Sequence, residues 1–477
     1  MSGAVDPIKG ELIVWAADRT DNFGNGPEFQ NTQTAVYFPN NGEVKLFPVD
    51  YIGHDMFCPG ISFDFNGNLL VTRGSSSEAA SLFNSQDQVW SKQTPMKLGR
   101  GYQSSTTISD GRIFTIGGSW SGNLETAKNG EIWDGNNNAW TLLPECQVEP
   151  MRTADSRGIY RQDNHAWLFA WKNESVFQAG PSTAMNWYTT EGEGSVSPAG
   201  RRGPDAMCGP AVMFDAVAGS ILAVGGAPEY EKTDATAEAY VVKIKDVGGE
   251  AEVERVADMQ AKRIFANSIV LPDGTVFVVG GQAYGKPFSD ETAAMAPELW
   301  DPSTKEFSLL AEGPTPRTYH SIALLMPDAT VFSGGGGLCG DCNGNPAANH
   351  FDGEMYSPPY LFQDNGETLA ARPRIAMVNP EAAQVGSDIT VTIEAEVAEA
   401  QFSLVRMGSS THTINTDQRR VPLEASFLET MTETGRTTTS YSITLPGDPG
   451  ILLPGYWYLF AMVNGVPSVA AIIKVTL

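Results

Sequence analysis

The chain repeats a pattern in which a turn opens an apolar run that is often closed by paired glycines. Three of the turns, at residues 66–67, 110–111 and 273–274, contain Asn-Gly or Asp-Gly steps, which supply the positive φ angles of tight hairpins, and the runs are rich in strand-forming Val, Ile and Phe. The units recur at about 45–55 residues, the spacing of propeller blades with four strands each. They lie at residues 10–16, 66–74, 110–118, 163–171, 219–226, 273–281 and 328–337. The seven units predict a seven-bladed β-propeller.

The glycine pairs that close these units have a structural interpretation. Glycine permits close packing near the crowded axis of a propeller. A phosphate-binding loop would require a helix directly after the glycines, and the pattern predicts none. Aromatic residues recur in the later hairpins, as at residues 131–140 and 298–307, and we expect them in the blade cores.

The pattern changes near residue 371, where the glycine pairs end. Residues 388–394 alternate apolar and polar positions, residues 456–462 and 470–475 form further apolar runs, and Asn464-Gly465 marks a hairpin. These features predict a small immunoglobulin-like β-sandwich. We therefore expect an all-β chain with a propeller over residues 1–371 and a second domain over residues 372–477.

Composition restricts the possible partners. The 477 residues carry a formal net charge of −25 at pH 7, which disfavours binding to nucleic acid phosphates and to anionic lipid surfaces. No apolar run is long enough to span a membrane, and residues 1–10 lack the apolar core of a signal peptide. Neutral or cationic small molecules remain as ligands.

Two of the five cysteines, Cys339 and Cys342, are close together in a Cys-Gly-Asp-Cys sequence within a glycine-rich loop. A zinc site would need a second pair of ligands at suitable spacing, and only the distant His350 follows. We predict a short-loop disulfide, with redox activity as the alternative. The odd number of cysteines leaves at least one thiol for another role.

Tyr319 and His320 are adjacent in a chain that has only five histidines. Neighbouring side chains of a regular strand point to opposite faces, so both reach one metal only where the backbone leaves strand geometry. An imidazole nitrogen beside a phenolic oxygen suits copper or iron. The alternative is a half-buried pair in an ordinary strand.

Several motifs, taken in order over essentially the whole chain, show a family resemblance. They are residues 55–60 (Asp-Met-Phe-Cys-Pro-Gly), 100–105 (Arg-Gly-Tyr-Gln-Ser-Ser), 117–122 (Gly-Gly-Ser-Trp-Ser-Gly), 160–167, 319–321, 334–342 and 411–420. Together they resemble the galactose oxidase family of copper radical oxidases. The resemblance implies a seven-bladed kelch-type propeller and an immunoglobulin-like domain whose loop reaches the propeller axis. Since the resemblance begins near the first propeller strand, we expect no amino-terminal carbohydrate-binding domain of the kind that fungal galactose oxidases carry.

The resemblance also implies the metal site. Tyr102, Tyr319, His320 and His412 stand at the positions of the family's copper ligands, and Cys58 stands where the family has a cysteine joined through sulfur to the tyrosine ring. The thioether of Cys58 with Tyr102 would donate electron density to the phenol and make Tyr102 easier to oxidise to a radical. Cys58 would thereby account for one unpaired thiol.

Trp120 stands at the family position that stacks over the thioether, where it would shield the radical. The alternative is a buried blade aromatic. The chemistry that the family implies is a two-electron alcohol oxidation shared between copper and the Tyr102 radical. Tyr319 would accept the proton of a primary alcohol, Tyr102 would abstract a hydrogen atom, and O2 would be reduced to H2O2.

Arg161 matches the family arginine that holds sugar hydroxyls, and four aromatic residues match pocket positions. Two residues depart from the galactose-specific pattern, Glu231 in place of glutamine and Ala266 in place of histidine. Glu231 has two interpretations, an ion pair with Arg161 or a direct acceptor for sugar hydroxyls. The aromatic pocket residues are Phe23, Tyr230, Phe265 and Phe288.

We therefore expect an oxidase of the primary alcohol of galactose or galactosyl saccharides, without an organic cofactor. The first alternative is the same radical copper chemistry on glyoxal or on aryl or aliphatic alcohols. Trp120 and Arg161 favour the sugar, whereas Glu231 and Ala266 weaken it. The second alternative is a non-catalytic kelch interaction module, which would not need the five metal-site residues together.

The other histidines and cysteines are predicted to be structural. His54, His165 and His350 match no family ligand, and we place His165 behind Arg161. Cys146 and Cys208 are predicted to be small buried residues. Asn173 begins a glycosylation sequon. Peroxide chemistry and the cysteine pair fit a secreted protein, which we expect to be monomeric.

Overall fold

The protein is built almost entirely of β-strands. The computed structural model describes the chain except residues 25–27, 75–76, 339–347, 395–396, 398 and 434. Its described helices are short, namely α1 (Ile159–Gln162) and the 3-10 turns η1 (Glu149–Met151) and η4 (Pro359–Leu361). No helix among the described residues has the length and apolarity to cross a membrane. The all-β prediction is confirmed.

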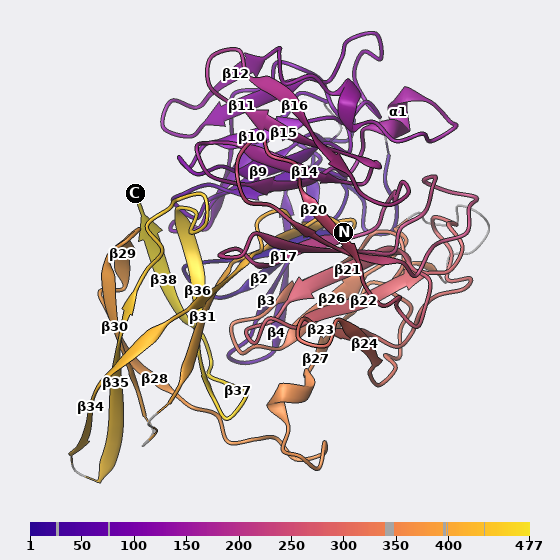
Figure 1. Ribbon diagram of the computed structural model, residues 1–477. Helices are drawn as coiled ribbons and strands as arrows, with labels where there is room; N and C mark the ends of the chain where they lie inside the picture. The colour runs from indigo at the N-terminus through magenta and orange to yellow at the C-terminus, as the bar shows by residue number, and fades with distance from the viewer. Residues whose placement is uncertain (25–27, 75–76, 339–347, 395–396, 398, 434) are drawn as a thin grey trace.

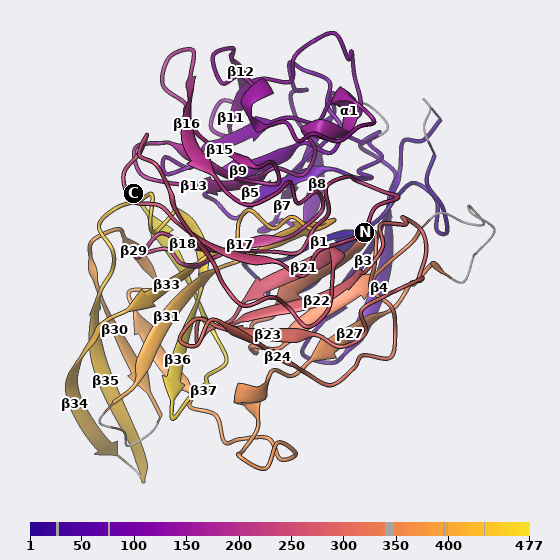
Figure 2. The same ribbon diagram turned by 45° about the vertical axis from the view of Figure 1, so that its right-hand side comes forward.

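Seven antiparallel sheets form the blades of a propeller (Figure 1 and Figure 2). Strands within each blade follow chain order from the axis outward, apart from one added strand described below. Blade 1 contains β1 (Ser2–Val5), β2 (Leu12–Trp15), β3 (Thr32–Phe38) and β4 (Glu43–Val49); blade 2, β5 (Gly60–Phe63), β6 (Leu69–Thr72), β7 (Ala80–Asn84) and β8 (Val89–Lys92); blade 3, β9 (Ser104–Thr107), β10 (Ile113–Ile116), β11 (Gly130–Asp134) and β12 (Ala139–Leu143). Blade 4 contains β13 (Trp167–Ala170), β14 (Val176–Gly180), β15 (Ala184–Thr189) and β16 (Ser195–Arg201); blade 5, β17 (Ala211–Asp215), β18 (Ser220–Val224), β19 (Ala239–Lys243) and β20 (Glu252–Arg255); blade 6, β21 (Ile264–Val270), β22 (Val276–Gln282), β23 (Glu298–Asp301) and β24 (Glu306–Leu309); blade 7, β25 (Ser321–Leu325), β26 (Val331–Gly335) and β27 (Gly353–Tyr356).

The predicted repeat corresponds to the second strand of a blade in six of the seven units. The exception is the unit at residues 163–171, which contains β13, the innermost strand of blade 4. Every residue of β13 and of β14 is buried, so both strands are apolar runs without alternation, and the pattern alone does not separate them. The predicted blade count is confirmed, and the unit at residues 163–171 marks the first strand of its blade rather than the second.

The C-terminal domain consists of two packed sheets, seen beside the propeller in orange and yellow in Figure 1. One sheet has the order β28 (Ile375–Asn379), β30 (Asp388–Ile393), β35 (Arg436–Thr444) and β34 (Ala425–Glu433). The other has the order β29 (Ala382–Gln384), β38 (Ala471–Thr476), β36 (Gly455–Val463), β31 (Gln401–Arg406) and β33 (Arg420–Leu423), with β37 (Val466–Pro467) paired to β36. The predicted sandwich is confirmed.

A loop of this domain enters the propeller and adds a strand to blade 1. The strand β32 (Ser409–Thr411) pairs antiparallel with β1, on its axial side, and lies between β25 and β5. Buried charges hold the loop, because Arg406 forms an ion pair with Asp417 at 2.7 Å and Asp417 accepts from the backbone nitrogen of Phe63 in blade 2 at 3.1 Å. The C-terminal domain thereby contributes to the centre of the propeller.

Candidate functional site

The backbone adopts the left-handed conformation just before or at the start of six of the innermost blade strands, with φ between 53° and 71°. These strands are β5, β9, β13, β17, β21 and β25, and the residues are, in the same order, Cys58, Tyr102, His165, Cys208, Phe265 and His320. A non-glycine residue rarely adopts such φ values, and where it does the surroundings hold it. The inserted β32 runs antiparallel to β1, so His412, which follows it with φ 56°, reaches the same end of the ring. The fold therefore gathers chemically active side chains around the axis.

His320 has a defined protonation pattern. Its Nδ1 lies 2.6 Å from the carbonyl oxygen of Gly337, and because a carbonyl only accepts, Nδ1 carries the proton and Nε2 keeps its lone pair. The left-handed backbone at His320 brings its ring into a stack with Tyr319, with centroids 4.0 Å apart. The predicted departure from strand geometry at this dipeptide is confirmed.

His412 presents an unpartnered nitrogen to the same place. Its Nδ1 lies 2.9 Å from Thr411 Oγ1, while Nε2 is buried without a hydrogen-bond partner among the described residues. Nitrogens of His412 and His320 and the sulfur of Cys58 lie within 4.8 Å of one another. Burial lowers the pKa of both imidazoles well below the usual value, so both rings are neutral and able to bind a metal ion.

Three buried tyrosines join their phenols beside these histidines. Tyr102 and Tyr230 each place their hydroxyl 2.9 Å from the hydroxyl of Tyr319. Burial raises the pKa of all three phenols well above the usual value. A metal ion at this point would oppose that effect, since a cation favours the phenolate.

Cys58 lies against Tyr102. Its thiol donates to the Tyr102 oxygen at 3.5 Å and lies 3.7 Å from His320 Nε2. Burial raises the pKa of the thiol. The predicted cross-link partners are therefore neighbours in space, although 44 positions separate them in the chain.

Trp120 and Arg161 form one wall near Tyr102. The Trp120 ring meets the Tyr102 ring edge to face rather than in parallel, at 4.9 Å and 75°. The Arg161 guanidinium lies over Trp120, Tyr160 and Tyr230, at 5.5, 5.4 and 5.4 Å from their centroids. Its Nη2 lies 3.0 Å from Glu231 Oε1, which is the ion pair that the sequence offered as one interpretation.

The predicted aromatic pocket separates into two groups. Phe23 and Phe288 are partly exposed and stack with centroids 5.9 Å apart. Phe265 and Tyr230 are only 2% exposed, and both rings pack against Tyr319. Phe23 and Phe288 therefore remain available to a ligand, while Phe265 and Tyr230 support Tyr319.

Two residues near the centre were not predicted there. His165 lies 3.2 Å from the Tyr230 hydroxyl and packs on Tyr102 and His412, and Arg161 is not among its partners in the described part of the chain. Both His165 and Arg161 contact Tyr230, so the expected position of His165 behind Arg161 stays a prediction. Arg73 places its guanidinium over the Tyr102 ring; the only signal in the sequence was that Arg73 interrupts the repeated glycine pair.

Of the remaining candidates, Cys208 borders this centre, since it packs with Tyr230, Phe265 and Tyr319. His54 bonds to Ser81 Oγ and to the Arg73 carbonyl, and His350 pairs with Asp290, which confirms structural interactions for both. Cys146 and Cys208 are buried free thiols, as predicted. Cys339 and Cys342 lie outside the described residues.

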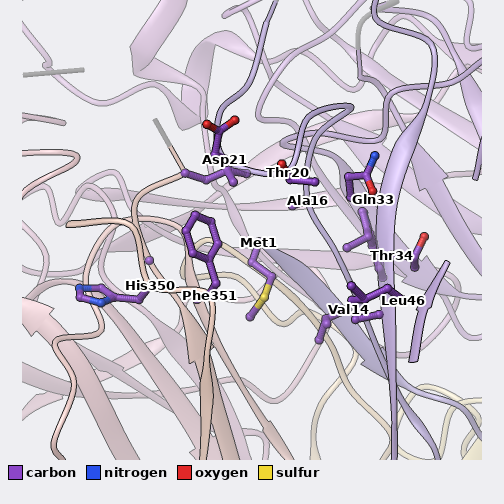
Figure 3. Close-up of a pocket in the computed structure, with 15 residues that line it drawn as sticks. Met1, Val14, Ala16, Thr20, Asp21, Gln33, Thr34, Leu46, His350 and Phe351 are labelled. Atoms are coloured by element: carbon purple, nitrogen blue, oxygen red, sulfur yellow. The ribbon is translucent and has the colours of Figure 1, made fainter. Parts of the chain in front are cut away.

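A cavity of about 480 Å³ lies close to the centre (Figure 3). Figure 3 shows His350 and Phe351 on one side of it and Val14, Gln33 and Leu46 on the other. None of the described residues that line it belongs to the predicted ligand or substrate set. Its lining residue Leu338 packs with Cys58 and Tyr102, so the cavity is a neighbour of the site.

Comparisons with known proteins agree with this arrangement. Residues 33–360 match the family described as Glyoxal oxidase N-terminus, and residues 372–475 match the family described as Galactose oxidase-like, Early set domain. A galactose oxidase of Gibberella zeae is 47% identical over 100% of this chain and 68% of its own length. The aldehyde oxidase GLOX1 of Arabidopsis thaliana is 25% identical over 91% of this chain and 73% of its own length.

The structure of a fungal alcohol oxidase is also similar throughout. That protein, described as having catalytic diversity among the AA5 family and solved in complex with copper, superposes with a TM-score of 0.92. It is 43% identical, and the match covers 100% of this chain and 97% of the other.

Proposed function

Because this chain belongs to the galactose oxidase family, we propose that it is a copper radical oxidase. It converts a primary alcohol to the aldehyde and reduces O2 to H2O2. The observation that carries the proposal is the meeting of Cys58, Tyr102, Tyr319, His320 and His412 at one buried point on the propeller axis. A non-catalytic interaction module has no use for this constellation.

The residues fit a single copper ion. Two neutral imidazole nitrogens and two phenol oxygens form a donor set that suits copper. His412 Nε2 is buried and lacks a partner among the described residues, and the proton on His320 Nδ1 leaves its Nε2 free. We assign Tyr102, Tyr319, His320 and His412 as the ligands. A metal ion would satisfy the unpartnered nitrogen, whose burial otherwise costs free energy.

Different side chains then carry out different steps of the reaction. Bound copper supplies a one-electron acceptor and polarises the alcohol. Tyr319 accepts the hydroxyl proton, and its contact with Tyr230 holds its oxygen in place. The Tyr102 radical abstracts a hydrogen atom from the adjacent carbon, and Trp120 shields the ring from water.

Cys58 prepares Tyr102 for this role. Joining Sγ to the ring carbon beside the phenol oxygen removes one hydrogen from each partner, and O2 takes up the two electrons and two protons as H2O2. The 3.5 Å contact between Sγ and the phenol oxygen brings the reacting groups together. The product is a protein-derived thioether that stabilises the radical.

For the substrate we propose the C6 hydroxyl of galactose or of a galactosyl saccharide. Phe23 and Phe288 offer apolar faces for a sugar ring, and Arg161 keeps Nε and Nη1 without partners among the described residues. Glyoxal or aryl and aliphatic alcohols form the second candidate class. The Arg161–Glu231 ion pair favours it, because this pair occupies one of the guanidinium donors.

Peroxide release tests the function. Copper-loaded protein is supplied in turn with galactose, raffinose, benzyl alcohol and methylglyoxal, and the Cys58→Ser variant serves as control. We expect peroxide from the wild type. After the disulfide is taken into account, the measured mass of the wild type should lie two hydrogens below the mass calculated from its sequence, and Cys58→Ser should show no such deficit. Absence of peroxide with every substrate would refute the oxidase, and the relative rates identify the substrate class.

The proposal extends to the organisation of the chain. We place the boundary between propeller and C-terminal domain at residues 371 and 372, supported by family matches that end at 360 and begin at 372. We also propose a secreted monomer with a Cys339–Cys342 disulfide. Asn173 is exposed in the turn between β13 and β14, a position that suits a glycan. Mass spectrometry with and without reductant tests the disulfide, and sedimentation tests the monomer.

A further inference from the structure

Arg73 connects the three parts of the proposed radical centre. Its guanidinium carbon lies 5.2 Å from the centroid of the Tyr102 ring. Nη1 donates to the carbonyl oxygens of Phe57 and Cys58 at 3.2 and 3.1 Å, and Nη2 donates to Ser121 Oγ, next to Trp120, at 3.1 Å. One side chain thus ties the Cys58 loop and the Trp120 loop together across the face of Tyr102.

Arg73 adopts a backbone conformation that is unfavourable for a residue with a side chain. Arg73 follows β6 with φ 73°, and in or just after their second strand four other blades carry a glycine with φ between 59° and 77°, namely Gly117, Gly225, Gly280 and Gly335. Glycine adopts such angles freely, whereas a side chain makes them unfavourable. Surrounding contacts must therefore hold Arg73, as the 2.6 Å bond from His54 Nε2 to its carbonyl does.

The charge of Arg73 is directed at the phenol. The side chain is buried, with 6% exposed, and no carboxylate of the described residues lies within ion-pair distance of it. A cation over an aromatic face is attracted by the electron density of the ring. One-electron oxidation of the Tyr102 phenolate leaves a neutral radical, so the attraction is stronger before oxidation than after it.

We infer that Arg73 is a positioning residue that raises the reduction potential of the Tyr102 radical and holds Cys58 beside the ring. This inference rests on the proposed radical function. Arg73 makes the radical a stronger oxidant of the substrate carbon, in opposition to the thioether, which donates electron density. The potential of the centre is therefore set by two residues with opposite effects.

Two variants test the charge. Arg73→Gln removes the charge and keeps a polar side chain whose amide nitrogen ends two bonds short of the Nη1 position, whereas Arg73→Lys keeps the charge and one donor group. Both retain a non-glycine side chain at φ 73°. Arg73→Gly removes the side chain at an angle that suits glycine, so it provides a measurement where a larger variant fails to fold.

The copper-loaded proteins are titrated with hexacyanoferrate(III) and hexacyanoferrate(II), and the radical is followed by its absorption. The electron lost by Tyr102 passes to hexacyanoferrate(III). At a fixed ratio of the two salts we expect the ratio of radical to reduced Tyr102 to rise roughly tenfold in Arg73→Gln and Arg73→Gly, as for loss of a desolvated cation–π contact. Arg73→Lys should stay within about twofold of the wild type by the same measure.

The outcomes distinguish this inference from the proposed function. The role of the charge is overturned if the reduction potential of the Tyr102 radical in Arg73→Gln equals that of the wild type. It is also overturned if Arg73→Lys shifts this potential as much as Arg73→Gln does. Neither result contradicts the oxidase function. A wild type that forms no radical and releases no peroxide overturns both. The mass deficit of two hydrogens, measured on the same samples, reports whether Cys58 is still held against Tyr102; complete cross-linking in Arg73→Gly would overturn the positioning of Cys58.

Discussion

The hydroxyl of Ser2 donates to Thr411 Oγ1 at 3.0 Å, although 409 positions separate the two residues in the chain. Thr411 Oγ1 in turn lies 2.9 Å from Nδ1 of His412. The first strand of the propeller thus orients a histidine that the C-terminal domain supplies. When His412 Nδ1 donates to Thr411, Nε2 keeps the lone pair that a metal requires.

Thr411→Val keeps the shape of the side chain and removes the oxygen beside His412. We expect copper affinity to fall by about 10- to 100-fold, as for other partners of ligating histidines. Competition with a chelator measures the affinity. Thr411→Ser keeps the oxygen and should bind copper as the wild type does; equal affinity in the valine variant would contradict the role of Thr411.

Tyr230→Phe removes the hydroxyl shared by Tyr319 and His165. We expect kcat on the best substrate to fall about tenfold, the effect of losing one hydrogen bond in the transition state, while KM stays within about twofold. Steady-state peroxide assays measure both constants. Tyr160→Phe is the matched control at a half-buried tyrosine. A raised KM with unchanged kcat would instead make Tyr230 a substrate contact, as the sequence suggested.

Glu231→Gln breaks the ion pair with Arg161 and frees guanidinium donors for a sugar. We expect KM for galactose to fall about three- to tenfold with kcat nearly unchanged, because Glu231 lies away from the reacting carbon. Kinetics on galactose, raffinose and benzyl alcohol check this. Glu229→Gln removes the same charge two positions earlier and should leave KM unchanged. Identical constants for Glu231→Gln on every alcohol would remove Glu231 from substrate recognition.

His54 makes stability depend on pH. Burial lowers the pKa of His54 from 6.5 to about 4, so the unfolded chain binds a proton between these values while the folded chain does not. Its contribution is complete above pH 6.5 and is lost as the pH falls toward 4, by about 3 kcal/mol. Denaturant unfolding at pH 7 and pH 4.5 measures the decrease in the free energy of unfolding. In His54→Gln this decrease should be smaller than in the wild type by about 3 kcal/mol. The same loss in both proteins would show that His54 is protonated in the folded state.

Local pattern was sufficient for much of the architecture. Turn steps and apolar runs predicted the number of blades, and alternation after residue 387 predicted the sandwich, because both signals arise from residues adjacent in the chain. The repeat does not mark the same strand in every blade, since residues 163–171 contain the first strand of blade 4, and two consecutive buried strands carry no alternation that separates them. It also showed that Tyr319 and His320 share a site only off a regular strand, where the structure has φ 71° at His320.

By itself the sequence determined the fold class, the family motifs and most of the candidate side chains at the centre. Only the tertiary structure decided how they meet. Antiparallel insertion of β32 brings His412 to His320, the hydroxyls of Tyr102 and Tyr230 converge on Tyr319, and Arg73 lies over Tyr102. These relationships join residues from different blades and domains, and they depend on how the ring closes around its axis, which no local pattern of apolar and polar positions records.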